Sequence, residues 1–255
     1  MTGAALVTGG RRGIGRGIAL ALADAGFAVA INAEVAADDL DATVRDVEQR
    51  GVGATPVIGN VADLANHEGL LDAAEAALGP LTTLVNNAGV TVVSRGDLLD
   101  ATPASFDRCM AVNARAVFFL SQAFGRRLVD RARPTDRHHC IINVTSANAH
   151  AVALNRAEYA VSKAAASMVT RCFAARLGGD DINVYEIQPG VIRTDMTAPA
   201  MDRYEAMIAD GFTLTPRAGE VGDVGRVAAA LAGGQFGYCT GQAVQVDGGL
   251  SVDRF

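Results

Sequence analysis

Short, uninterrupted apolar runs alternate along the chain with longer stretches in which apolar residues recur at helical spacing. Runs of the first kind are typical of strands that are buried on both faces of a parallel sheet. They predict strands at residues 4–8, 28–32, 54–58, 83–86, 140–144, 182–187 and 243–246. Helical connections between successive strands cover both faces of such a sheet. The pattern therefore predicts an α/β fold, with a doubly wound parallel sheet in a single domain over residues 1–255.

Two helical stretches, residues 113–130 and 157–177, are long and carry apolar residues on more than one face. A helix that is apolar beyond a single stripe buries more than one side. We therefore expect both helices to pair with copies of themselves as well as packing on the sheet. Residues 196–212 are rich in Met, Ala and charged residues, and we interpret them as a mobile lid over a ligand site.

A glycine-rich loop, residues 9–15, lies between the first predicted strand and the first predicted helix. This order is typical of dinucleotide-binding Rossmann folds, in which free N–H groups at the helix N-terminus bind the pyrophosphate. Gly9 permits the tight turn, Gly13 lets the backbone approach the pyrophosphate, and Gly15 allows close packing of the helix on the strand. The expected cofactor contacts of this loop are Gly9, Arg11, Arg12, Gly13, Ile14 and Gly15.

Tyr159 and Lys163 are four residues apart in a segment whose composition strongly favours a helix. This spacing places both side chains on one helix face, so the ammonium can lie close to the phenol. A neighbouring positive charge stabilises the phenolate and is expected to lower the pKa of Tyr159 toward physiological pH. For most isolated pairs at this spacing, a surface tyrosine beside a solvated lysine is the better interpretation, and here the neighbouring motifs favour the catalytic one.

These motifs occur in a fixed order along the chain. They are the segment 8–15, the Asn-Asn-Ala-Gly segment 86–89, Asn113, Ser146, Tyr159 with Lys163, and the segment 189–194. On these motifs the sequence resembles the short-chain dehydrogenase/reductase family along essentially its whole length. Within the family it is most similar to the 3-oxoacyl-(acyl-carrier-protein) reductases and their relatives of unassigned substrate.

The resemblance implies an oxidoreductase that transfers hydride between a nicotinamide and a carbonyl or secondary alcohol. It assigns the proton to Tyr159, the orientation of the carbonyl oxygen to Ser146, the nicotinamide ribose to Lys163 and a proton-relaying water to Asn113. Further cofactor contacts are implied at Asn60, Val61, Asn87, Ala88, Gly89, Pro189, Gly190, Ile192 and Thr194. The resemblance also implies a homotetramer built partly on the two long helices.

The choice between NAD(H) and NADP(H) depends on the end of the second strand. Enzymes that prefer NAD place a carboxylate there to bind the ribose 2′-hydroxyl, and Ala33 occupies this position. Arg12, assisted by Arg11, could instead bind a 2′-phosphate, so NADP(H) is favoured. Glu34 supports the alternative, because a carboxylate turned inward would repel the phosphate and favour NAD(H).

The substrate is less well indicated. His150 and Arg156 lie in segments that line the substrate pocket in relatives, and a guanidinium there would suit an acidic or phosphorylated substrate. A substrate bound to an acyl carrier protein would need a basic docking face. Candidate members of that face are Arg126, Arg127, Arg137 and Arg176.

Three function classes are compatible with these features. The favoured one is an NADP(H)-preferring carbonyl reductase similar to 3-oxoacyl-(acyl-carrier-protein) reductases. An NAD-linked sugar or polyol dehydrogenase is the alternative within the enzymes, and a non-catalytic nucleotide-sensing protein is the alternative outside them. Because degenerate family members usually lose the tyrosine or the lysine, the presence of all four catalytic positions favours an enzyme.

Composition narrows the range of partners. The net charge is −6 and the basic residues are mostly scattered, so nucleic acid is not expected as a partner. The cysteines are far apart in sequence, which predicts mostly buried, reduced thiols and implies neither a disulfide nor a metal site. The first strand leaves no room for a signal peptide and no apolar run is long enough to span a membrane, so a cytoplasmic protein is expected.

Overall fold

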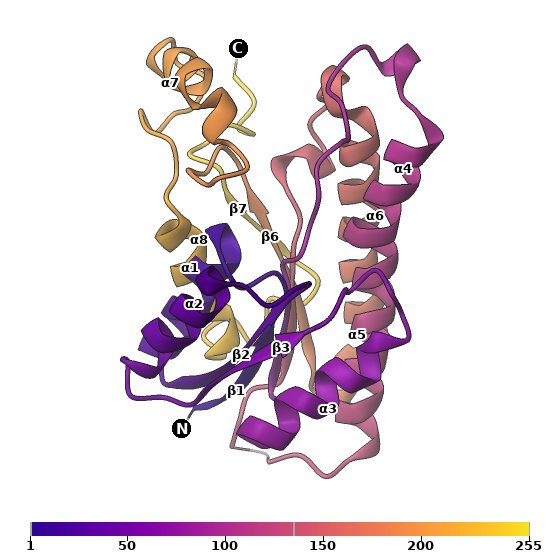
Figure 1. The fold of residues 1–255 in the computed structure, drawn as a ribbon, viewed down its shortest axis with the longest axis vertical. Helices are drawn as coiled ribbons and strands as arrows, with labels where there is room; N and C mark the ends of the chain where they lie inside the picture. The colour runs from indigo at the N-terminus through magenta and orange to yellow at the C-terminus, as the bar shows by residue number, and fades with distance from the viewer. Residues whose placement is uncertain (1, 135, 255) are drawn as a thin grey trace.

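The computed structural model describes residues 2–134 and 136–254. Its centre is a parallel sheet of seven strands in the order β3-β2-β1-β4-β5-β6-β7 (Figure 1). The strands are β1 (Gly3–Val7), β2 (Phe27–Ala33), β3 (Ala54–Ile58), β4 (Thr83–Asn86), β5 (Cys140–Val144), β6 (Asn183–Pro189) and β7 (Ala243–Val246). All seven predicted strands are confirmed, with small differences at their ends. The doubly wound fold expected from the alternating pattern is therefore present.

Helices cover both faces of this sheet (Figure 1). One layer consists of α1 (Gly13–Asp24), α2 (Asp38–Glu48) and α8 (Val221–Ala232). The other contains α3 (Asn66–Leu78), α4 (Pro103–Met110), α5 (Ala116–Asp130) and α6 (Ala157–Leu177). A short helix, α7 (Met201–Ala209), lies beyond the ends of β6 and β7. The 3-10 turns are η1 (Leu98–Asp100), η3 (Ala147–Ala149), η4 (Leu154–Arg156), η5 (Gly178–Asp180) and η6 (Ala198–Ala200), and η2 (Ala111–Arg115) is a π-helical turn.

The predicted helix at 113–130 starts ten residues too late. In the structure α4, the π-helical turn η2 and α5 follow one another without a break from Pro103 to Asp130. The N-terminus of α4 is determined by its cap. The Thr102 side chain accepts a hydrogen bond from the Ser105 N–H at 3.3 Å, and Pro103 occupies the first turn. The Thr-Pro pair was therefore an available start signal. The predicted helix at 157–177 coincides with α6.

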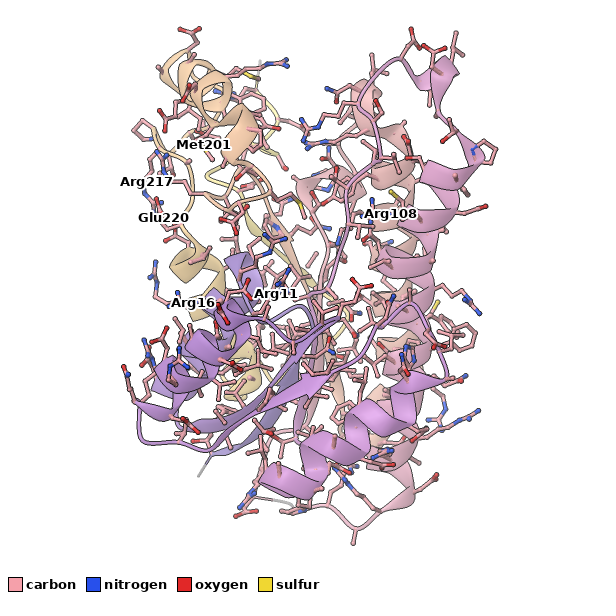
Figure 2. The ribbon with its side chains drawn as sticks, in the orientation of Figure 1. Arg11, Arg16, Arg108, Met201, Arg217 and Glu220 are labelled. Carbon is pink, nitrogen blue, oxygen red and sulfur yellow. The ribbon has the colours of Figure 1, made fainter. Side chains whose placement is uncertain are left out.

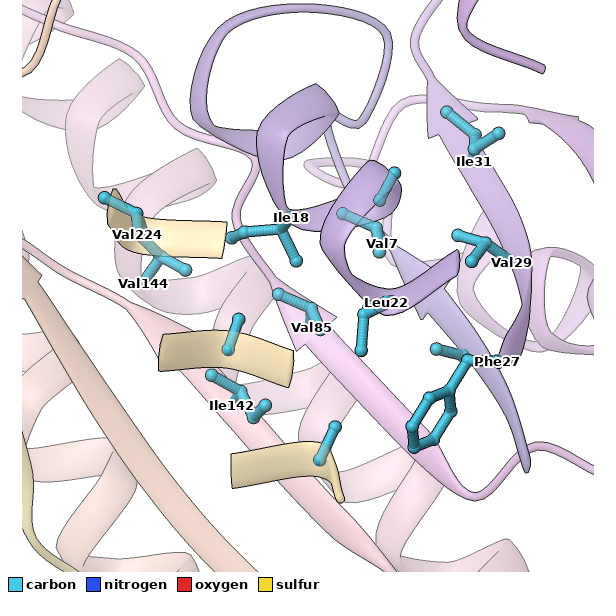
Figure 3. Close-up of a cluster of buried hydrophobic side chains, with 14 of the residues drawn as sticks. Val7, Ile18, Leu22, Phe27, Val29, Ile31, Val85, Ile142, Val144 and Val224 are labelled. Atoms are coloured by element: carbon cyan, nitrogen blue, oxygen red, sulfur yellow. The ribbon is translucent and has the colours of Figure 1, made fainter. Parts of the chain in front are cut away.

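The apolar core lies in two parts, one on each face of the sheet. Figure 3 shows the part beneath α1 and α8, where Ile18 and Leu22 of α1 and Val224 of α8 meet side chains of β1, β2, β4 and β5. The two helices approach closely at glycines, since a Cβ on Gly225 would lie only 2.5 Å from the Gly17 carbonyl oxygen. This packing fixes α1, and with it the loop that precedes α1.

The central strand β1 pairs with β2 on one side and β4 on the other, so successive connections leave it in opposite directions. Loops that follow neighbouring strands diverge at such a switch point and leave a crevice at the carboxyl ends of the strands. The loops after β1, β4 and β5 carry most of the predicted site residues. Within the described residues, no helix combines the length and apolar character needed to cross a membrane.

Candidate active site

A cavity of about 770 Å³ opens at the carboxyl edge of the sheet, where the switch point predicts a ligand. It extends from the glycine loop past the ends of β2, β3 and β4 to Tyr159 and Lys163 on α6. Arg11 lies on one wall and Arg108 of α4 lies on the other, as Figure 2 shows. The cavity therefore joins the predicted dinucleotide loop to the predicted catalytic pair.

The glycine loop has the geometry that its sequence predicts. Gly9 and Gly13 adopt φ angles of 61° and 56°, in the left-handed region that favours glycine. A Cβ on Gly15 would lie 2.3 Å from the Gly9 carbonyl oxygen and 2.5 Å from the Asn87 side-chain nitrogen. Only glycine fits at this position, and α1 can therefore present its free N–H groups to the cavity.

The loop after β4 is fastened to the loop after β1 by side-chain hydrogen bonds. The Asn87 side chain donates to the Thr8 carbonyl at 2.9 Å and to the Gly9 carbonyl at 3.1 Å. The Thr8 hydroxyl oxygen accepts from the N–H groups of Asn87 and Ala88, each at 3.0 Å. These contacts hold Asn87, Ala88 and Gly89 in the cavity wall, where the sequence placed them.

Tyr159 and Lys163 lie one turn apart on α6, with the lysine Nζ 5.8 Å from the tyrosine ring centroid. Lys163 is buried and donates to the Val144 carbonyl at the end of β5, at 3.0 Å. Ser146 lies two residues after the end of β5, and the interaction of its hydroxyl with Tyr159 lowers the pKa of Tyr159. One helix and one strand end thus bring the three predicted catalytic side chains together.

Asn113 is fully buried in the π-helical turn η2, a type of turn that is frequent at functional sites. Its side-chain oxygen accepts from the Val90 N–H at 2.8 Å, and its amide group donates to the Val90 carbonyl and the Ser162 hydroxyl, both at 2.9 Å. The side chain therefore fastens the loop after β4 to α6. The assignment of a proton-relaying water to Asn113 stays a prediction.

The expected lowering of the Tyr159 pKa is wrong for this structure. Burial raises the pKa of Tyr159, and the interactions with Ser146 and Arg156, which lower it, do not compensate. Burial also lowers the pKa of Lys163 to about 8, although the nearby Glu186 carboxylate acts in the opposite direction. The sequence spacing correctly placed the side chains of Tyr159 and Lys163 on one face of a helix, but it did not reveal that both are buried. Tyr159 is consequently a protonated acid at neutral pH.

Glu186 of β6 is a buried carboxylate behind the catalytic pair that the sequence analysis missed. It accepts hydrogen bonds from the Gln188 side chain and the Ser167 hydroxyl, both at 2.8 Å, and from the Thr145 hydroxyl. Thr145 precedes Ser146, and Ser167 follows Lys163 by one turn of α6. A charged residue inside the predicted strand 182–187 was the available signal.

The end of the cavity near β2 holds the residues that bear on cofactor choice. Ala33, Asn60 and Val61 line it as expected, together with Glu34, whose carboxylate accepts from the Asn60 amide at 3.0 Å. The two arginines of the glycine loop are paired with carboxylates. Arg11 lies 3.1 Å from Asp39, and Arg12 lies 3.4 Å from Asp195.

Several predicted contacts are outside this cavity. Thr194 lines it, whereas Pro189, Gly190 and Ile192 do not. Gly190 instead packs against Asp247, where a Cβ would come within 2.7 Å of the main chain. His150 is exposed and is absent from the lining, so the structure does not bring it to the site.

The predicted lid at 196–212 contains η6 and α7. Its first residue, Met196, lines the cavity, and Tyr204 on α7 is near enough to Tyr159 to contribute to the raised pKa of Tyr159. The segment is therefore close to Tyr159.

Two of the four cysteines, Cys172 and Cys239, are exposed, so the expectation of mostly buried thiols is wrong for half of them. All four are free.

Comparison with known proteins agrees with this arrangement. The family model described as enoyl-(acyl carrier protein) reductase matches residues 9–251. The chain is 32% identical over 254 residues to the 3-oxoacyl-[acyl-carrier-protein] reductase FabG of Staphylococcus aureus, with 98% of each chain covered.

Two solved structures are also similar over nearly the whole chain. A 3-oxoacyl-[acyl-carrier protein] reductase from Brucella melitensis in complex with NAD has a TM-score of 0.94, 38% identity and coverage of 100% of this chain and 99% of that one. A putative 2-deoxy-D-gluconate 3-dehydrogenase from Agrobacterium tumefaciens with bound NADP has a TM-score of 0.86, 29% identity and coverage of 98% and 96%. With the motifs, the sheet order and the catalytic geometry, these similarities show that the chain belongs to the short-chain dehydrogenase/reductase family and is similar to its FabG branch.

Proposed function

We propose that this protein is an NAD(P)H-dependent carbonyl reductase of the 3-oxoacyl-(acyl-carrier-protein) reductase type, which also oxidises the corresponding secondary alcohols. The bound nicotinamide supplies or accepts the hydride. In reduction, Ser146 orients the carbonyl oxygen and Tyr159 donates its phenolic proton to that oxygen as negative charge develops. Lys163 then stabilises the resulting phenolate with its ammonium charge.

The observation that carries this proposal is that Tyr159 and Lys163 meet at one end of the cavity that begins at the glycine loop, with Ser146 interacting with Tyr159 from outside the cavity wall. The loop fits a dinucleotide, because its positive φ angles and the absence of a Cβ at Gly15 open the backbone toward the cavity. A nucleotide-sensing protein would need only the loop. The preserved proton donor and its cation support an enzyme.

The direct test is a screen of ketones and secondary alcohols with NADH, NADPH and their oxidised forms, followed by nicotinamide absorbance. Simple ketones, oxo acids, sugars and 3-oxoacyl thioesters represent the competing substrate classes. Cofactor-dependent turnover of a carbonyl compound is the expected result. Tight binding of the cofactor without turnover of any class would favour the non-catalytic alternative.

We further propose that NADP(H) is preferred, through contact of Arg12 with the 2′-phosphate. Among the residues that the structure describes, Arg12 is held by a single long ion pair to Asp195, and both side chains are more than half exposed. Such a pair contributes little, so a dianionic phosphate can replace it. Glu34 in the cavity wall favours NAD(H) and the NAD-linked sugar or polyol dehydrogenase alternative.

Arg12→Ala is expected to raise the Kd of NADPH by about tenfold or more and to leave that of NADH nearly unchanged, because only NADPH offers the extra charge. Fluorescence titration with both cofactors measures this. Arg16→Ala is the matched control, since Arg16 lies on the same helix end, pairs with Asp46 and is outside the cavity wall. Equal losses for NADH and NADPH would assign Arg12 a structural role.

A cytoplasmic homotetramer is also proposed. The four free cysteines suit a reducing compartment. The two long helices carry exposed apolar residues, as a self-pairing face requires: Phe118 and Phe119 on α5, and Val161 and Met168 on α6.

Docking of an acyl carrier protein receives less support. Two of the four candidate arginines are already paired with carboxylates: Arg127 with Glu68, Asp72 and Glu75, and Arg176 with Asp180.

A further inference from the structure

Arg156 is a cation beside the catalytic tyrosine that the reaction scheme does not use. It lies at the start of α6, three residues before Tyr159, and its Cζ is 5.8 Å from the centroid of the Tyr159 ring. The side chain is half-buried, and its Nε is a buried nitrogen without a hydrogen-bond partner. The guanidinium therefore lies over the ring of the proton donor, and of its nitrogens only Nε is withdrawn from solvent without a partner.

A buried guanidinium N–H without a partner is unfavourable, because it has lost its hydrogen bonds to water without replacement. The planar fork of a guanidinium matches a carboxylate, which accepts two parallel hydrogen bonds. Among the described residues, no carboxylate lies within 4.0 Å of Arg156. An anion from outside the chain can supply the missing partner.

The nearby carboxylate that could neutralise Arg156 is committed elsewhere. Glu158 is buried and accepts a hydrogen bond from the Ser105 hydroxyl at 2.7 Å. On the wall opposite the glycine loop, Arg108 donates to the Thr91 carbonyl at 3.0 Å and likewise has no carboxylate within 4.0 Å among the described residues (Figure 2). Arg108 in the cavity wall and Arg156, which lies outside that wall but beside Tyr159, are thus two cations near the catalytic end without a carboxylate partner among the described residues.

The opposite end of the cavity differs in this respect. There Arg11 and Arg12 each have a carboxylate partner. Free positive charge is consequently concentrated beside Tyr159, where the substrate must place its carbonyl oxygen. A negatively charged substrate is attracted to this end by the uncompensated charge.

We propose that Arg156 binds a carboxylate of the substrate and that the protein acts on oxo acids in which this carboxylate is a few bonds from the reacting ketone. The inference rests on the proposed carbonyl reductase activity and gives its substrate class. The ketone accepts the hydride at carbon and the Tyr159 proton at oxygen, and the carboxylate is unchanged. Arg156 is a specificity-determining residue that holds the acid group while the ketone faces Tyr159.

Matched pairs of probes separate recognition of the acid from the chemistry. The probes are 3-oxobutanoate, 4-oxopentanoate and 5-oxohexanoate, each compared with its methyl ester. The unsubstituted protein should turn over at least one of the acids with a higher kcat/KM than its ester. Arg156→Gln should lower this acid-to-ester ratio by about tenfold or more, chiefly through KM for the acid. Arg156→Lys keeps the charge and should retain part of the preference.

The controls exclude other roles of Arg156. Arg171→Gln removes an exposed arginine about four turns farther along α6 and should leave the ratio unchanged. If Arg156 acted only by its charge on Tyr159, Arg156→Gln would lower kcat for acid and ester equally, and the proposal would be overturned. Equal kcat/KM values for acids and esters in the unsubstituted protein would overturn it as well.

A binding measurement distinguishes failure of this inference from failure of the proposed function. Calorimetric titration of the protein with pentanoate and pentanamide, in the presence of oxidised cofactor, requires no turnover. Pentanoate should bind the unsubstituted protein more tightly than pentanamide, and Arg156→Gln should remove that difference. If this result were obtained while no ketone was reduced, the anion site would stand and the reductase proposal would fail. Equal binding of the two ligands would overturn the anion site.

Discussion

Tyr159→Phe should lower kcat by about a hundredfold to ten-thousandfold while leaving the affinity for the cofactor nearly unchanged. The substitution removes only the phenolic oxygen, so the shape of the α6 surface beside the cavity is kept. The raised pKa of Tyr159 keeps the group protonated at neutral pH, as a proton donor in reduction requires. Without the proton, negative charge on the substrate oxygen must be neutralised by solvent, which is a poorer donor.

The experiment measures kcat for the best carbonyl substrate and the Kd of the cofactor by fluorescence titration. Tyr238→Phe is the matched control, because this tyrosine is fully exposed and lies outside the cavity wall. The Tyr159 variant should retain its thermal stability and its cofactor affinity. Turnover within a few-fold of the unsubstituted protein would show that another group donates the proton, and the catalytic assignment would be wrong.

The sequence predicts the sheet well because its strands are buried on both faces. β1, β2 and β5 consist of residues that are buried throughout, so their apolar runs are uninterrupted. The π-helical turn at Asn113 could not be predicted, since no local composition distinguishes it from the α-helices on either side. Its geometry depends on Val90 and Ser162, which are distant in sequence.

The site shows the same division between local and long-range information. Loop conformation at Gly9 and Gly13, and the shared helix face of Tyr159 and Lys163, follow from nearby residues and were predictable. The ion pair between Arg12 and Asp195 joins residues 183 positions apart, and its formation depends on the completed fold. The pKa values depend on burial in the same way, which explains why spacing alone gave the wrong direction for Tyr159.

Lys163→Met should abolish most of the activity and also change how stability depends on pH. The unsubstituted protein buries a lysine whose pKa falls from 10.5 to about 8. Below about pH 8 the lysine is charged in both the folded and the unfolded chain, and burial of this charge costs about 3 kcal/mol. Between about 8 and 10.5 the folded chain loses its proton first, so the unfolded chain binds more protons and stability rises with pH.

The Lys163→Met variant lacks the pH-dependent contribution of Lys163 to the free energy of unfolding. The difference in unfolding free energy between the two proteins therefore measures that contribution. The free energy of unfolding of the unsubstituted protein, minus that of Lys163→Met, should increase by up to about 3 kcal/mol from about pH 7.5 to about pH 10.5. Denaturant titrations of both proteins at each pH measure this difference. Loss of the hydrogen bond to Val144 shifts the difference by a nearly constant amount and does not change its slope.

The same titration links stability to catalysis. Charged Lys163 stabilises the phenolate that Tyr159 leaves after donating its proton, so kcat for reduction should fall as pH rises through about 8. The role of the Lys163 ammonium in catalysis explains why it is present although its burial destabilises the folded chain, as is common for groups at functional sites. A stability difference that does not change with pH would mean that the lysine keeps its proton in the folded chain. In that case the alkaline loss of activity would have to arise from Tyr159 itself.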